Sequence, residues 1–127
     1  MPRASRVMPM LSVADMAASR RFYETILGGT LVYAFPPEGE PVFLTLSFGE
    51  TEIGLGVLSD RGVHGRPLRP ASGHRIELCI NVDDVDATLK ALNAPIAMPP
   101  LDQPWGERAA YIEDPDGNLV MLVAPVG

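Results

Sequence analysis

The sequence has few of the features that mark secreted, membrane or nucleic-acid-binding proteins. Its one cysteine, Cys79, excludes an internal disulfide and suits a reducing cytoplasm. Its apolar runs are only a few residues long, so we expect neither a membrane span nor an N-terminal signal peptide. The formal net charge of −6 at pH 7 argues against a nucleic-acid partner and would suit a cationic small molecule.

The composition is that of one small globular domain covering residues 1–127. Hydrophobic residues make up 46% of the chain and charged residues 20%, which is ordinary for such a domain. A chain of this length is expected to bury roughly two-thirds of its unfolded surface around a single core. No phosphate-binding glycine loop, nucleophile elbow or catalytic pair of carboxylates is found in it.

The chain contains an internal repeat, in which a spacing of 69 residues relates Asp15 to Asp84. Each copy predicts a strand followed by a helix, with these aspartates as N-caps. We expect helices at residues 16–27, ended by Gly28, and at 85–92.

Strand-like segments follow each helix and complete two βαβββ modules. The expected strands lie at residues 30–34, 42–48 and 52–58, then near Ala97, and at 108–112 and 119–123. Module one spans about residues 7–58 and module two about 75–125. A linker at 59–74, rich in glycine, proline and arginine, joins them.

The last two predicted strands flank a tight turn that runs from Asp114 to Asn118 through Pro115 and Gly117. Proline presets φ and glycine can take a positive φ, which favours a hairpin. This hairpin closely resembles the last hairpin of the vicinal oxygen chelate superfamily, which includes glyoxalase I, extradiol dioxygenases, fosfomycin-resistance enzymes and bleomycin-resistance proteins. The resemblance covers about residues 7–125. It implies an α+β fold in which two βαβββ modules form half-open curved sheets.

The same resemblance implies where a metal ion would bind. Metal-using members of the superfamily place one ligand seven residues before each capping aspartate and one on the last strand of each module. The corresponding positions are Met8, Glu77, Leu55 (or the neighbouring Gly54 or Gly56) and Met121. Only Glu77 offers an oxygen, and a divalent ion needs several nitrogen, oxygen or thiolate donors, so we expect no metal cofactor. A shifted site that combines Glu77, Cys79 and a linker histidine, His64 or His74, is the open alternative.

Strand alternation indicates which side chains face the concave side of each sheet. With the apolar alternates packed under the helices, that side receives Met8, Met10, Ser12, Glu77, Cys79 and Asn81. Glu77 could be a cavity base with a raised pKa, or a half-exposed carboxylate paired with an arginine. Cys79 is expected to be a small buried residue.

Trp105 is the strongest candidate for a ligand contact. It is the only tryptophan, and Gly106 leaves one side of its indole uncovered. A Trp-Gly pair similarly placed before the turn stacks on the flat drug in the metal-free bleomycin-resistance proteins that this chain resembles. The alternative is a tryptophan in the core or in a dimer interface. Phe35, with Tyr33 and Phe43, could form the opposite wall, while Met8, Met10 and Met121 would supply adaptable apolar lining.

The linker region carries four arginines within fifteen residues: Arg61, Arg66, Arg69 and Arg75. A basic loop could clamp an anionic substrate. The alternative is a solvated linker that packs across a partner subunit, because glycine and proline interrupt it throughout.

Three functions remain open from the sequence. The first is a metal-free protein that binds a flat small molecule, cationic or neutral, in the cavity of a homodimer. The second is a divergent enzyme of the superfamily, a lyase, isomerase or dioxygenase, with Glu77 as acid–base or as ligand of a shifted metal. The third is a non-catalytic module that acts through protein contacts. A homodimer is expected because half-open sheets leave edges and an apolar concavity that need covering.

Overall fold

The protein is described here from a computed structural model, which describes residues 3–59, 64–66, 72–74 and 76–126. The chain divides into two compact units, Met1–Arg69 and Pro70–Gly127. The boundary between them lies inside the predicted linker. Each unit contains one βαβββ module, so the predicted fold class and module order are confirmed. That the two modules form a single domain stays a prediction.

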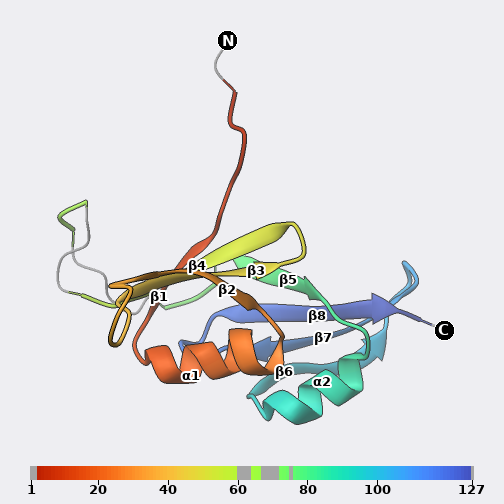
Figure 1. Cartoon of the computed structure of the whole chain (residues 1–127). Helices are drawn as coiled ribbons and strands as arrows, with labels where there is room; N and C mark the ends of the chain where they lie inside the picture. The colour runs from red at the N-terminus through yellow and green to blue at the C-terminus, as the bar shows by residue number, and fades with distance from the viewer. Residues whose placement is uncertain (1–2, 60–63, 67–71, 75, 127) are drawn as a thin grey trace. The chain divides into compact units, whose positions relative to one another are not determined.

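Module one is a four-stranded sheet with the strand order β1-β4-β3-β2. Its strands are β1 (Met10–Val13), β2 (Thr30–Phe35), β3 (Phe43–Phe48) and β4 (Thr51–Val57). β1 runs parallel to β4, and the other two pairs are antiparallel. The helical segment between β1 and β2 lies along one face of this sheet (Figure 1).

That helical segment begins as the predicted α-helix and continues as a π-helix, whose turns are wider. The Asp15 carboxylate accepts the backbone N–H of Ala18 at 3.1 Å, which confirms it as the N-cap of α1 (Met16–Arg20). From Arg21 the chain continues as a π-helix, η1 (Arg21–Ile26), where a single α-helix was expected. The i to i−5 bond from the Leu27 N–H to the Phe22 carbonyl shows the wider turn.

The core of module one lies between the helix and the sheet. Tyr23 of η1 is fully buried, as are inward-facing side chains of three strands: Val13, Leu44, Leu46 and Leu55. Gly28, at φ +83°, ends the helical segment as predicted, because this backbone region carries no steric penalty for glycine.

Module two repeats the topology with the strand order β5-β8-β7-β6. Its strands are β5 (Glu77–Asn81), β6 (Ile96–Asp102), β7 (Glu107–Glu113) and β8 (Leu119–Pro125), and its helix is α2 (Val85–Leu92). The Asp84 carboxylate caps α2 by accepting the Ala87 N–H at 3.0 Å. Asn93, at φ +49°, ends the helix. The segment near Ala97, faint in the sequence, is a full seven-residue edge strand.

The turn between β7 and β8 is built around one buried carboxylate. Asp114 is 4% exposed, and its Oδ1 accepts the backbone N–H groups of Asp116 and Asn118 at 2.9 and 2.8 Å. Its Oδ2 accepts the side-chain N–H of Asn118 at 2.8 Å. Gly117 has φ +82°, as the turn predicted. The carboxylate of Asp114 therefore holds the hairpin together.

The predicted linker is described only in part. Arg61, Arg69 and Arg75 lie outside the described residues. Arg66 is exposed, and its backbone N–H donates to His64 Nδ1 at 3.0 Å. Within the described residues, no helix has the length and apolar character needed to cross a membrane.

Candidate functional site

Each sheet has one face under its helix and one face without a helix. On the helix-free side of module two, the register places Cys79 beside Met121 and Met121 beside Tyr111, one residue from each of three adjacent strands. Glu77 and Glu107 share this side because strand residues two apart point the same way. We call this surface the module-two face: Glu77, Cys79, Glu107, Tyr111 and Met121.

Glu77 is exposed and is hydrogen-bonded to a tyrosine. The Tyr111 hydroxyl donates to Glu77 Oε1 at 2.6 Å. This bond, with partial burial and the carboxylate charge, raises the pKa of Tyr111 above its usual value. An arginine partner, one of the two alternatives for Glu77, is not seen among the residues that the structure describes; the partner there is Tyr111. The turn that starts at Asp114 sets the register between β7 and β8. The sequence alone could therefore have predicted that Tyr111 pairs with Met121.

Cys79 differs from the expectation, because it is exposed rather than buried. The alternation of β5 turns it away from the side that carries the helix, so the apolar core does not cover it. Partial desolvation, followed by the charges of Glu107 and Glu77, raises the pKa of its thiol. A raised pKa keeps the thiol protonated near neutral pH and disfavours a nucleophilic role.

Trp105 lies in the turn between β6 and β7 and is 60% exposed. The core alternative for this residue is therefore wrong. Its indole N–H donates to Glu107 Oε1 at 2.8 Å, which ties the ring to the module-two face. Gly106 follows with φ +95°, a conformation that favours glycine. The stacking role and the interface role of Trp105 both remain predictions.

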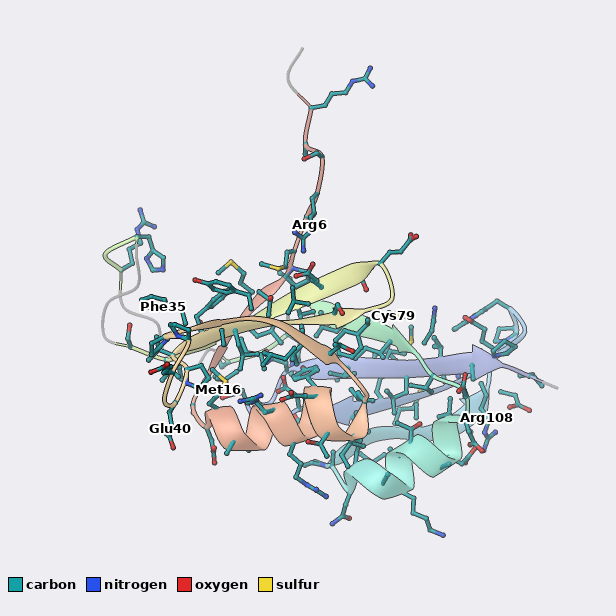
Figure 2. All side chains as sticks on the ribbon, viewed as in Figure 1. Arg6, Met16, Phe35, Glu40, Cys79 and Arg108 are labelled. Atoms are coloured by element: carbon teal, nitrogen blue, oxygen red, sulfur yellow. The ribbon has the colours of Figure 1, made fainter. Side chains whose placement is uncertain are left out.

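The helix-free side of module one carries a cluster of apolar and aromatic side chains beside polar ones, among them Glu52 in its ion pair with Arg6. We call it the module-one face: Met10, Tyr33, Phe35, Phe43, Gly54 and Gly56. The Phe43 ring lies over Gly54, where an added Cβ would be 3.0 Å from Phe43 Cε1. Tyr33 and Phe43 pack with ring centroids 6.4 Å apart. Phe35, at the end of β2 (Figure 2), is 54% exposed, and Met10 is 66% exposed.

Met8 is not a strand residue, in contrast to its expected place on the first strand, which begins only at Met10. Arg6 Nη2 lies 3.9 Å from Met8 Sδ and also forms a 2.6 Å ion pair with Glu52. Met8 therefore lies in the segment that precedes β1, where its sulfur contacts Arg6. It is not part of the sheet.

The register decides which residue of β4 matches Met121. Met10 pairs with Gly54, just as its repeat partner Cys79 pairs with Met121. Gly54 is therefore the counterpart of Met121, while Leu55 is fully buried on the helix side.

The residues at the four superfamily positions do not fit a divalent metal ion. Glycine and methionine stand where the last strands would supply ligands, and Glu77 Oε1 already accepts the Tyr111 hydroxyl. Over the described ranges, no three side chains of His, Cys, Asp or Glu gather closely enough to hold an ion. His64, one of the two histidines of the shifted-site alternative, uses Nδ1 to accept the Arg66 N–H.

Arg108 lies on the opposite side of β7, beside the start of α2 (Figure 2). Its guanidinium binds Asp86 of α2 at 2.8 Å and Asp102 of β6 at 3.0 Å. The bond from Arg108 lowers the pKa of Asp86. This charge therefore ties the helix to the sheet and does not contribute to the module-two face.

Comparison with known proteins identifies the family. The sequence profile of the Glyoxalase/Bleomycin resistance protein/Dioxygenase superfamily matches residues 5–122. The chain belongs to this superfamily. This match confirms the prediction of superfamily membership. Membership of the metal-free bleomycin-resistance branch stays a prediction. A search of functionally curated proteins found no match.

Several solved structures of the superfamily fold resemble this chain. A glyoxalase-related enzyme from Fulvimarina pelagi is 20% identical with a TM-score of 0.76, and the match covers 94% of this chain and 88% of that chain. TioX from Micromonospora sp. ML1 is 23% identical with a TM-score of 0.69 over 97% and 98% of the two chains. A superfamily member from Sphaerobacter thermophilus DSM 20745 is 27% identical with a TM-score of 0.69 over 94% and 97%.

Proposed function

We propose that this superfamily member binds a flat, positively charged small molecule without a metal ion, in the manner of the bleomycin-resistance branch. The observation that carries the proposal is Trp105, a large aromatic ring that is exposed and yet fixed in place by Glu107. An ordered aromatic surface stacks on planar ligands at a low cost in conformational entropy.

The surroundings of Trp105 support a cationic ligand. The negative charges of Glu107 and Glu77 both raise the pKa of the Cys79 thiol, so the module-two face is negatively charged around that residue. The net charge of −6 has the same sign and would attract a cation over a longer distance.

A homodimer is part of the proposal. The module-one face leaves Met10, Tyr33 and Phe35 more than half exposed, and exposed apolar side chains that cluster favour an interface or a ligand site. Size-exclusion chromatography with light scattering should give a dimer at micromolar protein concentration. A particle of 13.7 kDa, the mass of one chain, would contradict this part of the proposal.

Quenching of Trp105 fluorescence tests the binding function. A panel of flat cationic and neutral compounds should include cations that quench the single tryptophan. Trp105→Ala should weaken their binding by about 1–3 kcal/mol, the usual value for an aromatic anchor. Because the ring is exposed, the melting temperature of this variant should stay close to that of the wild type. A folded variant that binds every hit as tightly as the wild type would refute the stacking role.

An acid–base enzyme is the second candidate, favoured by the 2.6 Å hydrogen bond between Tyr111 and Glu77. The Fulvimarina pelagi structure is that of a glyoxalase-related enzyme, and the fold is compatible with such chemistry. Elemental analysis of protein purified without chelator separates the metal-dependent form of this candidate from the binding protein. We expect well under one equivalent of zinc, nickel, iron or manganese, because methionine and glycine supply no suitable donors. A stoichiometric metal that Glu77→Ala removes would favour the enzyme.

A further inference from the structure

The turn between β7 and β8 contains the one Asp-Gly pair of the chain, Asp116 and Gly117. Such pairs are chemically labile, because glycine has no side chain to hinder attack by its backbone nitrogen on the preceding carboxyl group. A bond forms between Gly117 N and Asp116 Cγ, the C–O bond of the carboxyl group breaks, and the hydroxyl leaves with the amide proton as water. Water then opens the resulting succinimide ring to aspartate or to isoaspartate, whose main chain runs through the side-chain carbon.

The folded turn holds the two reacting atoms apart. The Gly117 N–H donates to the Asp114 carbonyl at 2.9 Å, which closes a β-turn with Pro115 and Asp116 at its centre. Among the described residues outside glycine, a positive φ is found at Asn93 and not at Asp116. The turn is therefore of type I, in which ψ of the third residue is about 0°. Ring closure needs the Gly117 nitrogen on the same side as Asp116 Cβ, which this ψ does not allow.

The Asp114 carboxylate stabilises this closed form of the turn. Its Oδ1 accepts the N–H groups of Asp116 and Asn118 at 2.9 and 2.8 Å, one on each side of the labile peptide bond. Its Oδ2 accepts from the Asn118 side chain at 2.8 Å, and the Asp114 N–H donates to the Asn118 carbonyl at 2.9 Å. Rotation of ψ at Asp116 would move Asn118 away from these partners. The turn must therefore open before the succinimide can form.

We propose that Asp116 is a latent site of isoaspartate formation and that the Asp114 carboxylate controls its rate by keeping the turn closed. Ring closure is slow compared with the opening of a turn, so its rate follows the fraction of molecules whose turn is open. Isoaspartate adds a carbon to the main chain between Asp114 and Asn118, and the carboxylate no longer fits its N–H donors. The modification therefore weakens the β7–β8 hairpin. This proposal is independent of the proposed binding function.

Isoaspartate accumulation in folded and in urea-unfolded protein tests the proposal. Samples are incubated near neutral pH and digested, and chromatography with mass spectrometry separates the two forms of the peptide that contains Asp116. The rate in the unfolded chain divided by the rate in the folded protein is the protection factor, which cancels the effect of neighbouring residues on the chemistry itself. We expect a protection factor of at least about ten for the wild type, because only the open minority reacts.

Three variants locate the origin of the protection. Asp114→Ala should reduce the protection factor to about three or less, because the turn loses every bond to this carboxylate. Asn118→Ala removes only the side-chain bond and should give an intermediate value. Val85→Ala is the control, because Val85 is 2% exposed in the core of module two and follows the end of β5 that pairs with Val123, away from the turn. It lowers the stability of the module but should keep the protection factor of the wild type.

Thermal melts show which variants are folded at the incubation temperature. Equal rates in the folded and unfolded wild type would overturn the proposal, and so would wild-type protection in a folded Asp114→Ala variant. A rate in Val85→Ala as high as that in Asp114→Ala would also overturn it, since the reaction would then follow unfolding of the whole module. If Asp114→Ala does not fold, Asn118→Ala decides: an intermediate protection factor supports the proposal, and wild-type protection contradicts it.

Discussion

On the side of each sheet without a helix, module one carries Met10, Phe35 and Phe43, whereas module two carries Glu77, Tyr111 and Glu107. The two surfaces have the same strand order and a corresponding register. In module one a phenyl ring lies on glycine, and in module two a tyrosine reaches over a strand to a carboxylate. The repeat therefore preserves the backbone arrangement, while corresponding positions carry different chemistry: aromatic rings over glycine in module one, and a tyrosine bonded to a carboxylate in module two.

This difference bears on the prediction that no divalent metal binds at the superfamily positions. A site of that kind needs a donor from the last strand of each module. Gly54 supplies none because it has no side chain, and the Phe43 ring lies over it. Met121 offers only a thioether, which is a poor ligand for these ions, and it pairs with Tyr111. The two modules therefore differ in what stands at the donor position, a glycine under an aromatic ring in one and a methionine in the other.

The largest expected effect concerns the turns that join the last two strands of each module. Asp114→Ala should lower the free energy of unfolding by about 2–4 kcal/mol, because three hydrogen bonds to a buried carboxylate are lost. In the corresponding turn of module one, the Thr51 hydroxyl donates to the Phe48 carbonyl at 2.9 Å. Thr51→Ala should therefore cost no more than about 1 kcal/mol. Urea denaturation measures both, and equal losses would contradict this contrast between the turns.

The next largest effect tests how closely the Phe43 ring packs on Gly54 in the module-one face. An added Cβ on Gly54 would lie 3.0 Å from the Phe43 ring, whereas on Gly56 it would lie 3.6 Å away in ordinary contact. Gly54→Ala should therefore be less stable than Gly56→Ala by about 1–2 kcal/mol, as expected for overpacking. The matched pair cancels the general benefit of alanine over glycine in a strand. If thermal melts show the two variants to be equally stable, Phe43 does not rest closely on Gly54.

The smallest effect tests the negative charge of the module-two face. Glu107 and Glu77 both raise the pKa of Cys79 because a nearby negative charge disfavours the thiolate. Glu107→Gln should therefore lower this pKa and speed alkylation by iodoacetamide near neutral pH by about two- to threefold, as for a partly screened charge pair. Glu77→Gln should have a smaller effect and Glu40→Gln none. An unchanged rate in Glu107→Gln would show that its charge does not reach the thiol.

Local sequence signals predicted most of the fold. The capping aspartates, Gly28 and the turn that starts at Asp114 each act through neighbours a few residues away, and the structure confirms all of them. The edge strand β6 was the weakest prediction because its run from Ile96 to Asp102 lacks regular alternation and contains two prolines. The π-helix η1 was missed because no composition rule distinguishes it from an α-helix.

The candidate site could be predicted only in part. Alternation placed Glu77 and Cys79 on the same face, and the motif before the turn drew attention to Trp105. Alternation could not show that Cys79 is exposed, since exposure depends on what covers a face. Nor could it supply the partner of Glu77, because Tyr111 is 34 residues away in the sequence.

The sequence by itself determined the two βαβββ modules, their caps and turns, and the lack of metal donors at positions such as Met121. These depend on residue type and on contacts within a few residues, which the order of amino acids states directly. Only the tertiary structure decided that Tyr111 binds Glu77, that Gly54 lies under Phe43, and that Trp105 stands exposed on Glu107. The first two depend on which strands become neighbours and in which register, and the third on what covers the turn before β7. All three are properties of the folded sheet and not of any short segment of the chain.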